Sequence, residues 1–293
     1  MERRSREVER YIRHSKVTDP GGMSWAFEGL PRDIPALVET IQGFFLHIHW
    51  AGRYGVTPTE EQKGHVQSRL VSRILEVLVS QDPAPLTRSR PLERRFFGNC
   101  RDYSVFLCSV LRSQGVPARA RCGFGTYFLP GTYEDHWVCE YWNGERWVML
   151  DAQIDDFQRS RLGIDFDTLD MPEGRFVKAS EAWLMCREGR EDPEKFGIFD
   201  MRGMWFVRGN VLRELAALNG AEMLPWDVWG LMSEDLSEDA AQGDYGELVR
   251  AERHTLLDKV SRALVEDDDD AILSLYRCEP GLAVPEELLV AGR

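Results

Sequence analysis

The sequence lacks the features that mark a membrane, secreted or repeat protein. It contains no run of about 18 apolar residues, so no segment is predicted to span a membrane. Residues 1–15 include no apolar stretch, and a signal peptide is therefore not expected. Internal repeats and low-complexity linkers are also missing. One domain over residues 1–293, with helical elaborations, is therefore a better prediction than two domains.

Cysteine is present without the spacing that a structural role would need. None of the six cysteines forms a C-x-x-C pair, and their spacing fits neither a disulfide scaffold nor a zinc ribbon. We therefore expect a cytoplasmic protein with reduced thiols and no metal site. The cysteines are Cys100, Cys108, Cys122, Cys139, Cys186 and Cys278.

Basic residues are outnumbered, at 36 against 49 acidic ones, which gives a net charge of -13. A chain of this charge is not expected to bind nucleic acid or an anionic membrane surface. The composition is 43% hydrophobic and 11% aromatic, enough for a sizeable core and untypical of a disordered protein. The oligomeric state is left open by these totals.

Helical periodicity dominates both ends of the chain. Apolar residues at helical spacing predict helices within residues 34–52 and 66–78, so that the region 1–94 is mostly helical. The C-terminal region, residues 156–293, is also predicted to be mostly helical. Its acidic run at residues 266–270 is interpreted as a solvated patch rather than a metal site.

The middle of the chain has a different pattern. Residues 98–152 are predicted to form a helix followed by three strands. Residues 153–200 contain turn signals and are predicted to be irregular, apart from a short helix at residues 179–187.

The most informative segment is a helix with clear boundaries that begins at a cysteine. Asn99 is a good N-cap, and Asp102 resembles the acidic partner of a capping box. Gly115 and Pro117 then end the helix. Cys100 is thereby predicted in the first turn, where unpaired N–H groups and the helix dipole favour a negative charge. A thiol in that position has a lowered pKa and more thiolate, the nucleophilic form.

A base and an orienting carboxylate follow on two predicted strands. His136 opens the run HWVCEYW, Asp151 closes the run RWVMLD, and Asn143-Gly144 between them is a strong hairpin signal. A two-residue type I′ turn would pair His136 directly with Asp151 on one face, with Cβ atoms about 5 Å apart. The three residues then have the relation of a nucleophile, a base and an orienting group.

Other candidate residues have simpler interpretations. His47 and His49 would face apart on a helix and are not expected to share a metal, so they are interpreted as core or cleft-lining residues. Cys108, Cys122 and Cys139 are predicted core residues. Four aromatic residues could line a cleft, but their first interpretation is as core residues: Trp50, Tyr127, Phe128 and Trp137.

The segments GNCRDYSVFLCSVLRSQGVPARARCGF, DHWVCEYW and WVMLDAQ resemble the core of the transglutaminase-like superfamily over about residues 95–155. The resemblance implies an α+β, papain-like fold, with the nucleophile helix packed on an antiparallel sheet. It also implies a catalytic triad of Cys100, His136 and Asp151. Animal members use calcium, but the sequence has no calcium-loop signature, so no cofactor is expected.

The implied activity is acyl transfer on a peptide or small-molecule amide or ester, through a thioester on Cys100. Hydrolysis and transamidation both remain open. One alternative is an enzyme that forms amide bonds in small-molecule biosynthesis. Another is a non-catalytic binding module that keeps the fold.

Overall fold

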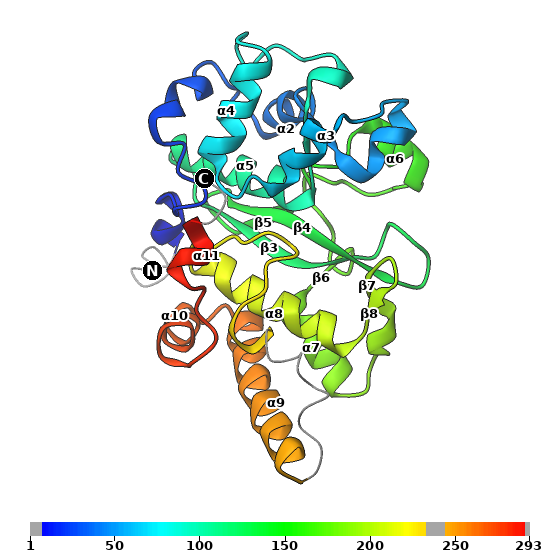
Figure 1. Ribbon diagram of the computed structural model, residues 1–293, viewed down its shortest axis with the longest axis vertical. Coiled ribbons are helices and arrows are strands. Elements are labelled where there is room, and N and C mark those ends of the chain that lie inside the picture. The colour runs from blue at the N-terminus through cyan, green and yellow to red at the C-terminus, as the bar shows by residue number, and fades with distance from the viewer. Residues whose placement is uncertain (1–7, 233–243, 291–293) are drawn as a thin grey trace. The chain divides into compact units, whose positions relative to one another are not determined.

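The computed structural model describes residues 8–232 and 244–290, which divide into two compact units. Figure 1 labels the strands β3 (Ala118–Gly125) and β4 (Tyr133–Trp142), and each of them has residues in both units. The predicted single domain stays a prediction. Unit 1 comprises residues 1–120, 137–172 and 290–293, and unit 2 comprises residues 121–136 and 173–289, as far as they are described.

Helices and three short strands build most of unit 1. The predicted helix at residues 66–78 is confirmed in its larger part, since α4 begins at Val71. The α-helices are α2 (Ile34–Gln42), α3 (Glu60–Lys63), α4 (Val71–Gln81), α5 (Cys100–Ser113) and α6 (Asp156–Leu162). The 3-10 helices are η1 (Arg10–Ile12), η2 (Gly21–Phe27), η3 (Ile48–Tyr54), η4 (Gly64–Gln67) and η5 (Leu92–Arg94). The strands that lie wholly in unit 1 are β1 (Phe45–His47), β2 (Phe96–Gly98) and β5 (Trp147–Leu150).

The predicted helix over residues 34–52 is wrong beyond Gln42. The chain passes from α2 through Gly43 into β1, which pairs in parallel with β2. The residues of β1 are buried on both faces of the strand, and such strands are continuously apolar rather than alternating. In the sequence, the apolar run of β1 therefore looks like a continuation of the apolar face of a helix.

Unit 2 combines strands with long helices. The short helix predicted at residues 179–187 is confirmed as α7 (Ala179–Arg187), and helices fill the described C-terminal part as expected. The helix α8 (Met204–Leu218) packs against α7 and α9 (Asp244–Val265). The remaining elements are β6 (Phe176–Lys178), η6 (Pro193–Lys195), β7 (Phe196–Ile198), β8 (Met201–Arg202), α8 (Met204–Leu218), α9 (Asp244–Val265), α10 (Asp269–Cys278) and α11 (Glu286–Val290).

The larger sheet is mixed rather than antiparallel as predicted. Its strand order is β6-β3-β4-β7-β8, and β5 also pairs with β4. Strands β5 and β6 pair antiparallel with their neighbours, whereas β7 runs parallel to the start of β4. The chain between β4 and β7 includes α6 and α7, and a crossover of that length allows a parallel return.

The acidic run at residues 266–270 is mostly exposed, and two of its residues also make structural contacts. The Asp268 side chain caps α10 by accepting the N–H of Ala271 (3.1 Å). Asp267 lies 3.3 Å from the buried guanidinium of Arg121, which also pairs with Glu214. The run therefore stabilises the junction between α9 and α10.

An aromatic cluster fixes helix α5 inside unit 1. The ring of Phe45 on β1 lies 5.0 Å from that of Tyr103 and 5.2 Å from that of Phe106, both on α5. Edge-to-face and tilted pairs of this kind contribute about 0.5–1.5 kcal/mol beyond their buried area. Every residue of α5 from Cys100 to Arg112 is buried, so the polar side of this helix is covered as well.

Buried charges in the first turn of α5 are paired. The Arg101 guanidinium lies 3.0 Å from Asp102, and both side chains are fully buried. The Nη2 atom of Arg101 donates to the carbonyl of Arg69 (2.6 Å). Burial raises the pKa of the Asp102 carboxyl to about 6, while Arg101 and the Asn99 N–H oppose the rise. At neutral pH the pair is therefore ionised.

Replacing Asp102 by Asn should destabilise the protein strongly, because it leaves the Arg101 guanidinium buried without its counter-ion. We expect a loss of about 3–5 kcal/mol in the free energy of unfolding, measured with urea near pH 7.5. Glu76→Gln breaks the exposed pair with Arg73 and serves as the control, with a loss below about 1 kcal/mol. Equal losses in the two variants would contradict this account of the buried pair.

Candidate active site

Cys100 is the first residue of α5, as the sequence predicts. Gln114 is the C-cap, and Gly115 follows with a φ of 82°, the left-handed conformation expected of the residue that ends the helix. The Cys100 side chain is 7% exposed. It lies where the N–H groups of the first turn have no partners within the helix, an environment that stabilises a thiolate.

The capping box at the start of α5 is formed as predicted. The Asn99 side chain accepts the N–H of Asp102 (3.2 Å), and the Asp102 carboxylate accepts the N–H of Asn99 (2.9 Å). Gly98 makes room for this exchange, since a Cβ at that position would lie 3.0 Å from the Asp102 carboxylate. The direction in which the chain enters the cysteine helix is thus fixed by Gly98, Asn99 and Asp102.

Asp151 follows β5 directly and is 1% exposed. Its N–H donates to the carbonyl of Thr168 (2.8 Å), and its Oδ1 accepts the N–H of Gln153 (2.9 Å). The Gln153 amide in turn donates to Gln158 (3.0 Å). Gln158 donates to the Tyr54 hydroxyl (3.3 Å). This buried polar chain holds the segment that carries the carboxylate.

The predicted register between β4 and β5 is wrong by two residues. Four residues, 143–146, separate the strands, and Cys139 pairs with Leu150 where the prediction paired Cys139 with Val148. The Asn143 side chain accepts the N–H groups of Glu145 and Arg146, each at 2.9 Å, which stabilises the longer turn. A shift of two residues leaves every side chain on its predicted face of the hairpin.

His136 lies on β4 within unit 2 and is 2% exposed. Two half-buried aromatic rings of the same unit surround it: Phe128 at 4.8 Å and Tyr127 at 6.0 Å, both edge-to-face. Sequence reasoning assigned these two rings to the core. Their contact with the candidate base instead makes them candidate site residues, in line with the alternative that they line a cleft.

The candidate triad is distributed over both units. Cys100 and Asp151 belong to unit 1, while His136 is the last residue of a unit 2 segment and is followed by Trp137 of unit 1. The contacts of His136 with Cys100 and Asp151 therefore stay a prediction.

His47 and His49 do not lie on an α-helix with their side chains facing apart, as was predicted. His47 ends β1, and its Nδ1 accepts the N–H of His49 (3.3 Å), with ring centroids 5.6 Å apart. They do not face apart because His47 caps a 3-10 helix instead of lying inside an α-helix. His47 pairs in register with Gly98, two residues before Cys100, and is 8% exposed. It is therefore a further residue near the helix start.

The remaining sequence candidates agree with their core interpretation. Cys108, Cys122 and Cys139 are fully buried, and Trp50 and Trp137 are 6% and 1% exposed. Across the part of the chain that the structure describes, no three His, Cys, Asp or Glu side chains are grouped as a metal site would require. Within the same residues, no helix is long and apolar enough to cross a membrane.

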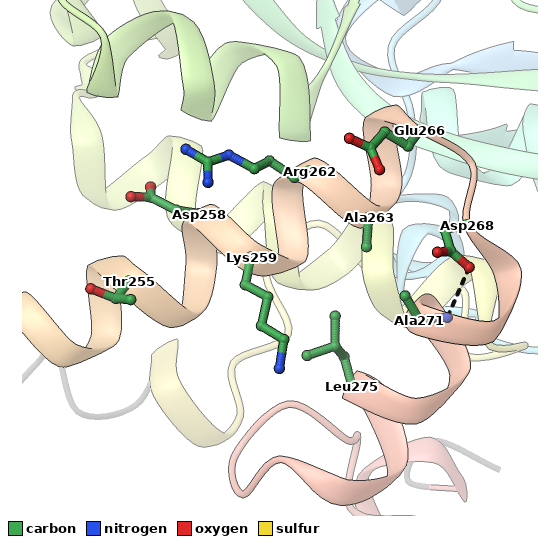
Figure 2. A pocket seen from close by; sticks show the side chains of 9 residues that line it. All are labelled: Thr255, Asp258, Lys259, Arg262, Ala263, Glu266, Asp268, Ala271 and Leu275. Atoms are coloured by element: carbon green, nitrogen blue, oxygen red, sulfur yellow. Dashed lines mark hydrogen bonds between the residues drawn. The ribbon is translucent and has the colours of Figure 1, made fainter.

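A cavity of about 410 Å³ lies in unit 2 along α9 and α10 (Figure 2). One of its charged side chains, Asp258, pairs with Arg187 (3.1 Å) and accepts from Trp183 (2.7 Å). The lining contains no cysteine or histidine, so it offers no thiol nucleophile or imidazole base. It consists of Thr255, Asp258, Lys259, Arg262, Ala263, Glu266, Asp268, Ala271 and Leu275.

Residues 58–152 match the family model of the transglutaminase-like superfamily core. The match contains all three candidate triad residues and begins well before residue 95, where the sequence prediction placed the start of the core. No curated protein sequence matches this chain. A solved structure from Cytophaga hutchinsonii, provisionally named a cysteine protease, is 16% identical with a TM-score of 0.35. The alignment covers 59% of this chain and 45% of that protein, so this chain spans less than half of its length.

Proposed function

Because residues 58–152 carry a transglutaminase-like core, we propose that the protein is a cysteine-dependent acyl-transfer enzyme with Cys100 as its nucleophile. The observation that carries the proposal is the position of Cys100, at the capped start of a buried helix inside the matched region. The N–H groups and dipole of the first turn favour the thiolate, which is the form that attacks a carbonyl.

His136 acts in this proposal as general base and acid, and Asp151 orients it. Two observations support these roles. Both residues lie in the matched region, and the alternation of side chains along β4 and β5 favours one common face for them. A carboxylate beside an imidazole fixes its tautomer and stabilises the imidazolium that forms during the reaction.

The reaction begins when the Cys100 thiolate attacks the carbonyl carbon of an amide or ester. A C–S bond forms, and the π electron pair of the carbonyl moves onto its oxygen. When that pair returns, the C–N or C–O bond breaks, and the departing amine or alcohol takes a proton from the His136 imidazolium. Water or an amine then attacks the thioester carbon and gives a proton to His136. A C–O or C–N bond forms, the C–S bond breaks, and its electron pair stays on the sulfur, which restores the thiolate beside the imidazolium.

The substrate class is a peptide or small-molecule amide or ester. The half-exposed rings of Tyr127 and Phe128 beside His136 provide an apolar surface for the acyl group. An amine acceptor would make the same chemistry amide-forming, and a water acceptor would make it hydrolytic.

Alkylation by iodoacetamide near neutral pH should modify Cys100 first, although Cys278 is exposed and Cys100 is only 7% exposed. Thiolate content rather than exposure should decide the rate, because only the thiolate is nucleophilic. Burial raises the pKa of Cys186 to about 11, so this partly exposed thiol should react slowly. Peptide mapping by mass spectrometry at short times gives the order. Labelling of Cys278 before Cys100 would remove the support for a nucleophile at position 100.

Hydrolysis of p-nitrophenyl acetate should require the triad as a unit. Cys100→Ala and His136→Ala should each lower the turnover by at least about 10³-fold, and their combination should add almost nothing. Cys278→Ala is the matched control and should keep the wild-type rate. Stopped-flow absorbance measures released nitrophenolate, and urea unfolding checks that each variant is folded. Undiminished turnover in Cys100→Ala would sink the mechanism.

A further inference from the structure

The side chain of Asn99 is satisfied at one end only. Its Oδ1 accepts the N–H of Asp102 (3.2 Å), and this capping bond identifies the oxygen, so that the other end of the amide is Nδ2. The residue is 5% exposed, and Nδ2 is buried without a hydrogen-bond partner among the residues that the structure describes. Two N–H donors are therefore held, unused, at the start of the cysteine helix.

Helix capping does not account for this amide. Asp and Ser cap a helix about as well as Asn, and neither would bring a buried N–H donor with it. Native proteins pair nearly all buried donors, because burying a donor without a partner is unfavourable. The amide nitrogen of Asn99 is therefore available to an acceptor other than the described residues.

Two other unpaired polar atoms of unit 1 do not fit the same position. The buried Oε1 of Gln153 is an acceptor, so it cannot stabilise a negative charge. The indole nitrogen of Trp137 is a buried donor, but side-chain alternation along β4 directs Trp137 to the face opposite His136. Asn99 is directly adjacent in sequence to the candidate nucleophile.

Attack on a carbonyl creates a demand for such a donor beside Cys100. As the C–S bond forms, the carbonyl oxygen takes up the π electron pair and becomes an oxyanion, which fixed N–H groups stabilise. The capping bond holds the Asn99 amide rigidly at the helix start, next to the first-turn N–H groups. We propose that Asn99 Nδ2 is the side-chain donor of the oxyanion hole; this inference rests on the proposed function of Cys100.

Two small reagents distinguish an effect on oxyanion stabilisation from an effect on the thiolate content of Cys100. Acetylation of Cys100 by p-nitrophenyl acetate passes through an oxyanion, whereas alkylation by iodoacetamide displaces iodide from a saturated carbon and forms none. Both reactions use the thiolate, so the ratio of the two rate constants cancels any change in thiolate content. Released nitrophenolate and mass spectrometry of the Cys100 peptide give the two rates.

Asn99→Ser and Asn99→Asp both keep a capping oxygen and remove the amide donor. We expect the ratio of acetylation to alkylation to fall about 10²–10³-fold in each variant. Asp268→Ser, which keeps a cap at the start of α10, should leave the ratio unchanged. An unchanged ratio in both Asn99 variants overturns the role of Asn99 while leaving Cys100 as nucleophile. Failure of the wild-type Cys100 to be acetylated would instead overturn the proposed function, and the role of Asn99 with it.

Discussion

The reciprocal hydrogen bonds between Asn99 and Asp102 fix where helix α5 begins, and the position of Cys100 depends on them. They act together with a buried ion pair, since the same Asp102 carboxylate receives the guanidinium of Arg101, which also binds the carbonyl of Arg69. The cap is thus tied to the segment before α4. A helix start held in this way keeps the N–H groups of its first turn in one place, as preorganised charge stabilisation requires.

The cysteine helix could be predicted from the sequence because its signals are local. Asn99 and Asp102 at one end, and Gly115 at the other, determine the boundaries through contacts within a few residues. The helix α7 could also be predicted from the sequence for this reason. The strand β1 could not be predicted in this way, because it depends on pairing with β2, which lies about 50 residues later in the chain. A buried apolar run is compatible with both structures until that partner is known.

The candidate site shows the same division between local and distant contacts. The alternation of side chains along β4 and β5 determines which residues share a face of the hairpin. This assignment stayed correct although the turn prediction was wrong, because the register moved by an even number of residues. The turn itself depends on the side chain of Asn143, which accepts two N–H groups and stabilises a longer loop. The positions of the Tyr127 and Phe128 rings beside His136 depend on the conformation of a loop, which the periodicity of the sequence does not predict.

The central claim is that Cys100 acts as a thiolate paired with His136, and the pH dependence of Cys100 alkylation tests it most directly. The rate constant for iodoacetamide should be followed from about pH 5 to 10 in the wild-type protein and in His136→Gln. The account predicts an apparent thiol pKa well below about 8.5 in the wild type, which rises when the imidazole is removed. A single titration near 8.5 or above, the same in both proteins, would contradict it.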